Sequence, residues 1–122
     1  MQQNNPMNPQ VLFIIEGDPR VSAKPAEAIR IAAGVGTWKK TDITVYLRGP
    51  GVLALSEFAD ELVDEDNYTR YFPIVGDFGR PIYVQKGATL LEEIGDSPLK
   101  YEEIDDSQLA SLCAQSKYVL RF

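Results

Sequence analysis

The feature that most constrains the fold is a run of five apolar residues, Val11 to Ile15, which the polar segment Glu16-Gly17-Asp18-Pro19 ends. A strand with one face in water alternates apolar and polar side chains, whereas this run has no polar member. It therefore predicts a central parallel strand whose two faces are both covered. Parallel neighbours require long crossover connections, so helices are expected between the strands.

The rest of the chain alternates strand and helix signals. Further strands are predicted over 42–47, 81–85, 101–104 and 118–122. Helices are predicted from Ser22 to Gly34 or Gly36, from Val52 with Leu55, Phe58, Ala59 and Leu62 inward, from Thr89 to Ile94, and from Asp106 or Ser107 with Leu109, Leu112 and Cys113 inward. Trp38 is predicted to pack under the loop that returns to the second strand. The order βαβαβαβαβ predicts a three-layer α/β/α sandwich around a parallel sheet.

Residues 11–122 are predicted to form a single α/β domain, preceded by a disordered tail over residues 1–10. The tail lacks the basic and apolar regions of a signal peptide, and no apolar run reaches the ~20 residues that cross a bilayer. Cys113 is the only cysteine, so an internal disulfide is excluded and a reducing cytoplasm is the expected location.

Charge and composition exclude several kinds of function. The formal net charge of −6 opposes non-specific nucleic-acid binding, which needs clustered Lys and Arg. The chain has no histidine, which excludes imidazole metal sites, Ser-His and Cys-His nucleophile pairs and a histidine general base. We therefore expect no nucleic-acid partner, no membrane partner, no metal site and no cofactor.

Five segments together carry a family resemblance: the Ala-rich predicted helix Ala26–Ala33, the predicted strand Ile43–Leu47, Gly51-Val52 just after it, the segment Arg80–Gly87, and the closing segment Ser116–Phe122. They resemble the DsrE/DsrF/DsrH-like family of sulfur-relay proteins. The resemblance implies a five-stranded sheet in the order 4-3-2-1-5. It also implies assembly into dimers, trimers or hexamers, and a sulfurtransferase context with sulfur-relay proteins as partners.

Catalytic members of that family carry a persulfide-forming cysteine just after the third strand. Here the position is Gln85, or its neighbour Lys86. An amide cannot ionise to a nucleophile or hold a sulfane sulfur. The resemblance therefore implies that no catalytic residue is present at this position.

A ligand site is predicted at the carboxyl edge of the sheet, where open α/β sheets bind ligands. Its candidate residues are Gly17, Asp18, Arg20, Arg48, Gly49, Gln85 and Lys86. Arg20, Arg48 and Lys86 could hold a small anion. The alternative is that these are ordinary turn residues with solvated charges.

Three further features have two interpretations each. Cys113 is either a persulfide carrier or a buried apolar residue of its helix. The six acidic residues within 57–66 are either a divalent-cation site or the solvated face of an amphipathic helix. Tyr68, Tyr71, Phe72 and Phe78 are either core or the surface of an oligomer.

The favoured function is a non-catalytic DsrE-like protein that serves as an oligomeric assembly or small-ligand-binding subunit in sulfur relay. One alternative is a thiol-dependent sulfurtransferase that uses Cys113. The other is an orphan α/β domain that binds a small anionic metabolite.

Overall fold

The computed structural model describes residues 8–122, so residues 1–7 of the predicted tail lie outside the described residues. Within that range the strands are β1 (Gln10–Ile15), β2 (Asp42–Leu47), β3 (Ile82–Gln85), β4 (Tyr101–Ile104) and β5 (Tyr118–Arg121). The α-helices are α1 (Lys24–Thr37), α2 (Glu65–Gly76) and α3 (Asp106–Gln115), and the 3-10 helices are η1 (Gly49–Leu55), η2 (Ala59–Glu61) and η3 (Thr89–Glu93).

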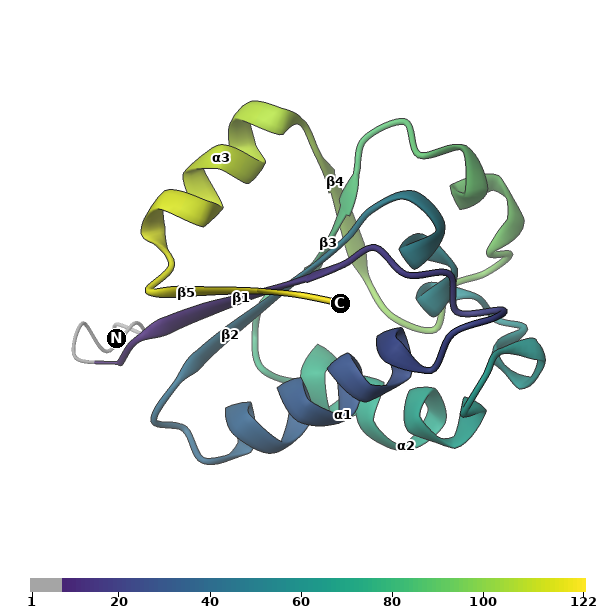
Figure 1. The fold of residues 1–122 in the computed structure, drawn as a ribbon, viewed down its shortest axis with the longest axis horizontal. Helices are drawn as coiled ribbons and strands as arrows, with labels where there is room; N and C mark the ends of the chain where they lie inside the picture. The colour runs from purple at the N-terminus through teal and green to yellow at the C-terminus, as the bar shows by residue number, and fades with distance from the viewer. Residues whose placement is uncertain (1–7) are drawn as a thin grey trace.

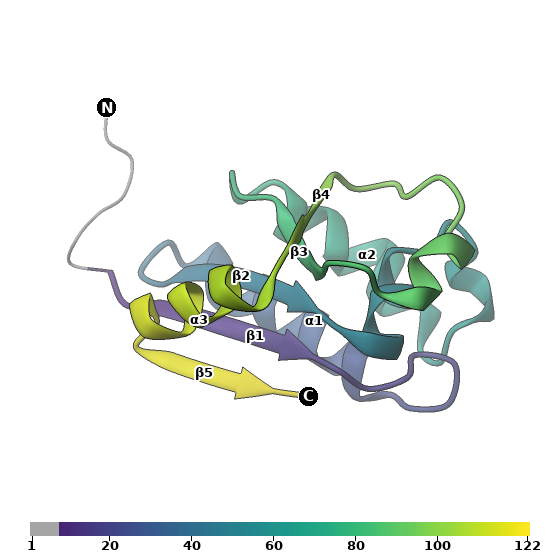
Figure 2. The same ribbon diagram turned by 90° about the horizontal axis from the view of Figure 1, so that it is seen from above.

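All strands are parallel and lie in the order β4-β3-β2-β1-β5. α1 and α2 cover one face of the sheet and α3 covers the other (Figures 1 and 2). The predicted three-layer sandwich and the strand order are therefore confirmed.

β1 is hydrogen-bonded on both sides, to β2 and to β5. Its side chains alternate between two apolar clusters: Phe13 and Ile15 belong to the first cluster, and Leu12 and Ile14 belong to the second. All residues from 11 to 15 are buried. The uninterrupted apolar run is explained, because a strand covered on both faces needs apolar side chains at odd and even positions.

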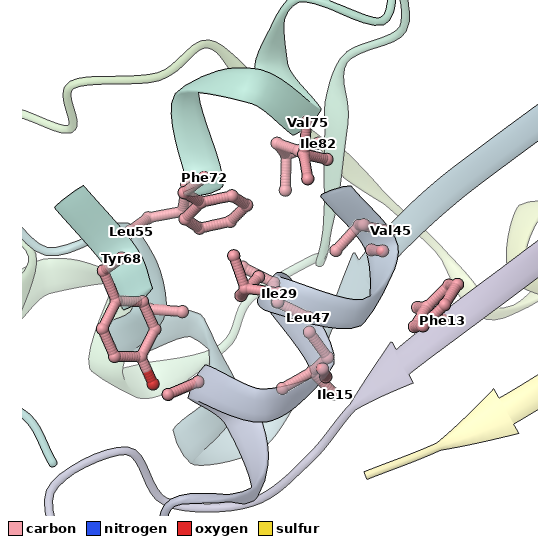
Figure 3. Close-up of a cluster of buried hydrophobic side chains, with 14 of the residues drawn as sticks. Phe13, Ile15, Ile29, Val45, Leu47, Leu55, Tyr68, Phe72, Val75 and Ile82 are labelled. Atoms are coloured by element: carbon pink, nitrogen blue, oxygen red, sulfur yellow. The ribbon is translucent and has the colours of Figure 1, made fainter. Parts of the chain in front are cut away.

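The two faces of the sheet are covered unequally. The cluster beneath α1 and α2 contains most of the buried side chains, among them Ile29, Leu47 and Phe72 (Figure 3). The cluster beneath α3 is small and consists of Leu12, Ile14, Tyr46, Ile104 and Leu109, with Tyr83, Leu112 and Cys113 packed against it. The first face therefore provides most of the hydrophobic stabilisation.

α1 starts later and ends later than its sequence signals predict. Ser22 is not the N-cap; its Oγ accepts a hydrogen bond from the Lys24 amide (3.2 Å) before the helix begins. The helix continues past Gly34, and Gly36 packs against the Phe78 ring. Trp38 follows the helix with 77% of its surface exposed, so the prediction that it packs under the return loop is wrong.

The predicted helix from Val52 through the acidic residues is also wrong. The chain forms η1 and η2 instead, and Asp64, in the left-handed conformation (φ 57°), separates them from α2. Leu55 and Leu62 are buried as predicted, but Phe58 is 45% exposed. The six acidic residues are exposed, although they do not share one helix face.

Two contacts set the path of this segment. Gly51 lies so close to the Ile15 carbonyl oxygen that a Cβ there would collide with it. Glu57 is tied to the loop before β4, because its amide donates to Ile94 O (2.9 Å) and its carboxylate accepts from the Asp96 amide (2.6 Å). Such long-range contacts override the local preference for one continuous helix.

The aromatic segment that the sequence left ambiguous is α2, with Pro73 inside it. Tyr68 and Phe72 are 3% exposed, so of the two interpretations, core or oligomer surface, they belong to the core. Tyr71 and Phe78 are partly buried and pack against the same cluster.

Smaller differences concern element ends. β3 begins at Ile82, and η3 is preceded by Ala88 rather than capped by Thr89. α3 is capped by Asp105, whose carboxylate accepts from the Gln108 amide (2.9 Å) while the Gln108 side chain accepts from the Asp105 amide (2.9 Å). This capping box places the cap one residue before Asp106.

We predict that Gly51→Ala destabilises the protein by about 1–3 kcal/mol, because the added methyl group meets a backbone carbonyl that cannot move aside. Urea unfolding measures this change. Gly34→Ala is the matched control: its Cβ meets open space within α1, so stability should stay equal or rise by up to ~1 kcal/mol. Equal stability of both variants would contradict the close approach at Gly51.

We predict that removing the α3 cap changes the pH dependence of stability. The hydrogen bond from the Gln108 amide and that from the Ser107 hydroxyl lower the pKa of Asp105. A lowered pKa in the folded state stabilises the protein above the unfolded-state value of ~3.9, and this contribution is lost as pH falls through the folded-state pKa. Asp105→Ala should therefore lower the urea midpoint at neutral pH, and the difference from wild type should shrink as the pH falls below the unfolded-state pKa and through the lowered folded-state pKa.

Candidate functional site

The carboxyl ends of the strands meet at one edge of the sheet, where the loops after β1, β2 and β3 also lie (Figure 2). All seven candidate residues are in these loops or at the strand ends. The structure divides them into separate groups instead of a single pocket.

Gln85 and Gly49 form the first group. The Gly49 amide donates a hydrogen bond to Gln85 Oε1 (2.9 Å), which joins the end of β3 to the turn after β2. Gly49 has a positive φ of 52°, a conformation that glycine adopts without strain. Both residues line a cavity of about 330 Å³, together with Pro50, Gly87, Ala88, Thr89 and Leu90.

Asp18 and Arg20 form the second group. Two hydrogen bonds join the Arg20 guanidinium to the Asp18 carboxylate (2.9 and 3.0 Å), and a third runs from the Arg20 amide to the same carboxylate (2.9 Å). The Arg20 side chain accordingly lowers the pKa of Asp18. Arg20 is therefore already paired, and an anion would have to compete with Asp18 for it.

Arg48 belongs to a third group around Glu16. The Glu16 carboxylate lies 3.7 Å from Arg48 Nε and accepts from Arg121 Nη2 (3.1 and 3.2 Å). Gly17 is next to this group, and its amide donates to Phe122 O (3.1 Å). Glu16 and Arg121 were not among the site residues predicted from the sequence. The strand order was the signal that could have found them, because it places the end of β5 beside the end of β1.

Lys86 does not line the cavity. Its amide donates to Ile104 O (3.0 Å), and its side chain is exposed. The charge of Lys86 contributes to the lowered pKa of Asp105. Arg20, Arg48 and Lys86 were predicted to hold one anion together. In the structure Arg20 pairs with Asp18, Arg48 lies near Glu16, and Lys86 is exposed, so the three do not form one group.

Cys113 lies near the opposite edge of the sheet, where the amino ends of the strands are. α3 leads from the carboxyl end of β4 to the amino end of β5, and Cys113 is in its last turns (Figure 1). The side chain is half-buried and packs against the cluster beneath α3. The sole thiol and Gln85 therefore belong to opposite edges.

Comparisons with known proteins support the fold. No protein-family model matches the sequence, and no curated protein matches it by sequence. The ychN protein from E. coli, known from a crystal structure, is similar in structure: the TM-score is 0.75 at 20% identity, over 93% of this chain and 99% of that one. The chain has a DsrE-like fold. At this identity the likeness concerns the fold alone.

The chemistry available in a DsrE-like fold depends on the residues at this edge. The cavity lining contains a carboxamide and a hydroxyl, from Gln85 and Thr89, but no carboxylate, cysteine or lysine. In residues 8–122 no group of three or more acidic or cysteine side chains is arranged to hold a metal ion. No helix in the same range has the length and apolar character needed to cross a membrane.

Tyr46 is a buried polar residue near this edge, and it was not among the site residues predicted from the sequence. Its hydroxyl has no hydrogen-bond partner among the described residues. Burial raises the pKa of this phenol, and the nearby Arg48 opposes the rise. Tyr46 is therefore neutral at physiological pH and contributes no charge to the edge.

We predict that the carboxamide of Gln85 stabilises the loop after β2. Gln85→Ala removes the acceptor of the Gly49 amide and should cost about 1 kcal/mol in urea unfolding. Gln85→Glu keeps an acceptor of the same length and should retain most of the stability. Gln115→Ala, an exposed site at the end of α3, is the control with no change expected. Equal losses in the Ala and Glu variants would contradict the acceptor role.

Proposed function

We propose that this chain is a non-catalytic DsrE-like protein that acts as an oligomeric, small-ligand-binding subunit in sulfur relay. The observation that carries the proposal is the hydrogen bond from the Gly49 amide to Gln85 Oε1. In the family that the sequence resembles, the corresponding position holds a persulfide-forming cysteine. Here the side chain serves as a structural acceptor at the wall of a cavity.

The cavity favours a small, uncharged polar ligand. Its lining supplies the Thr89 hydroxyl and the Gln85 carboxamide for hydrogen bonds, with apolar contact from Pro50, Ala88 and Leu90. An anion would gain no charged side chain inside this lining. To use Arg20 or Arg48 it would compete with Asp18 or Glu16, which makes the anionic-metabolite alternative weaker.

The proposal includes a homo-oligomeric state, a cytoplasmic location and sulfur-relay proteins as partners. A reducing compartment agrees with a chain that has one unpaired thiol. The subunit would then bind a ligand or a partner protein without carrying sulfur itself.

The thiol-enzyme alternative would require chemistry at the other edge of the sheet. A persulfide on Cys113 would form in a half-buried position against the apolar cluster that contains Leu109. Among residues 8–122, Cys113 takes part in no ion pair or hydrogen bond with a cationic side chain that would stabilise a thiolate. No observation favours this alternative over the proposal.

We predict that Gln85→Cys creates a reactive thiol. The shorter side chain leaves the Gly49 N–H without its acceptor, and this N–H dipole and the charge of the adjacent Lys86 both favour a nearby thiolate, so the pKa should fall below the usual ~8.5. Alkylation rate against pH measures it, in a Cys113→Ala background. On incubation with glutathione persulfide, this variant should gain one sulfur atom by mass as the donor is released as glutathione.

The wild-type chain should take up no sulfur in the same assay. Stable sulfur uptake at Cys113 of the wild type, passed on to an acceptor thiol, would overturn the proposal in favour of the thiol enzyme. A pKa at or above ~8.5 for the introduced thiol would mean that the edge is not prepared for sulfur chemistry and that the likeness to sulfur carriers ends with the fold.

A further inference from the structure

Two exposed aromatic side chains lie at opposite ends of the molecule. Trp38 is 77% exposed and Phe58 is 45% exposed. α1 runs from the carboxyl edge of the sheet to the amino edge, so Trp38 at its end lies at the amino edge (Figure 1). Phe58 follows η1, on the loops of the carboxyl edge. Exposed tryptophan is unusual on a surface without a partner, because this residue dominates the centres of protein interfaces.

Trp38 borders a shallow groove on the outer side of α1. The groove has a volume of about 500 Å³ and is lined mostly by apolar groups, with Ile31, Val35 and Trp38 spaced along the helix. Gly34 also lines the groove, and a Cβ at that position would touch nothing within 4 Å. The groove therefore has room for one apolar side chain beside the indole.

The charges around the two aromatic residues are opposite in sign. Lys39 and Lys40 follow Trp38 directly, and neither has an ion-pair partner in the described part of the chain. Asp60 and Glu61 follow Phe58, and they too have no ion pair there. Of the two lysines, Lys40 lines the Trp38 groove, whereas Lys39 lines a separate cavity. The two apolar side chains therefore have neighbours of opposite charge, an arrangement that selects partners by charge.

We propose that a second copy of this chain docks head to tail, with the Phe58 side chain of one copy in the Trp38 groove of the other. Lys40, which lines the groove, would then face Asp60 and Glu61 of the neighbouring copy. The contact rests on the oligomeric state in the proposed function and names its interface. It does not depend on the cavity at Gln85.

Charge decides between this contact and a symmetric one. A twofold contact through Trp38 would bring two pairs of lysines together, and a twofold contact through Phe58 would bring two acidic rims together. Because the two faces lie at opposite edges of one molecule, the Phe58 side chain of a copy cannot reach the groove of that same copy. The interface is therefore heterologous, and successive copies repeat it around a ring or along a chain.

The test uses Trp38 as the reporter, since it is the only tryptophan. With rising protein concentration, its emission should shift to shorter wavelength and its quenching by acrylamide should fall, while sedimentation records assembly. Trp38→Ala and Phe58→Ala should each weaken the association about tenfold or more. Both residues are exposed enough that truncation leaves the core intact.

Mixing the two variants gives the decisive result. Phe58→Ala retains an intact groove and Trp38→Ala retains an intact Phe58, so an equimolar mixture should form a dimer that neither variant forms alone. Gly34→Leu should fill the groove and block association without loss of stability. Val119→Ala, which changes an apolar side chain 39% exposed on β5, a strand that contributes to neither face, is the matched control and should assemble like wild type.

Two other outcomes overturn the proposal. If the wild type is an oligomer and both truncations leave it unchanged, the contact is wrong while the oligomeric state stands. If the wild type is a monomer at ~100 µM, the contact and the assembly in the proposed function both fail. Neither outcome affects the sulfur-uptake assay on Gln85→Cys, so the two proposals fail separately.

Discussion

The pairing of β1 with β2 on one side and with β5 on the other is the contact on which the remaining structure depends. It places β1 between two apolar clusters, and it also fixes the loops that leave the sheet. The Arg48 amide donates to Ile15 O (3.0 Å), and the Gly51 backbone approaches the same carbonyl. The Glu16 amide donates to Phe122 O (2.9 Å), while the Phe122 ring stacks on Phe13 (5.7 Å between centroids). The hydrogen bonds that pair β1 with its neighbours thus extend into the loops and set the geometry of the carboxyl edge.

That edge is built mainly from backbone hydrogen bonds and paired charges. Glu16 is shared by Arg48 and Arg121, and Asp18 holds Arg20. Gln85 is the one candidate side chain that both lines a cavity and holds a backbone amide of another loop. A glutamine in this position needs no thiol chemistry to support the fold, because its amide oxygen accepts the hydrogen bond that orders the turn.

The net charge of −6 does not describe how charge is distributed around the exposed apolar residues. A uniformly acidic surface would oppose self-association. Here the basic residues next to Trp38 and the acidic residues next to Phe58 are segregated to opposite edges, so the proposed contact would supply a local attraction within an overall repulsion between copies. The two groups of charges are kept apart by the path of the chain. Trp38 follows α1, near the end of one crossover, and Phe58 precedes η2, near the start of the next. Each crossover joins opposite edges of the sheet.

The sequence by itself determined the fold class and the place of the candidate site. The apolar run 11–15, the strand signals at 42–47 and 101–104 and the order of the elements follow from local side-chain chemistry, which each segment carries with it. The position of Gln85 at the end of β3 follows in the same way. The sequence did not determine the path from Val52 to Asp64, the exposure of Trp38 and Phe58, or the partners of the charged residues. These depend on contacts between segments distant in the chain, such as Glu57 with Asp96 and Arg121 with Glu16, and no local pattern records such contacts. Only the tertiary structure decided them, because the free energy of a long-range contact exists only after the segments have been brought together.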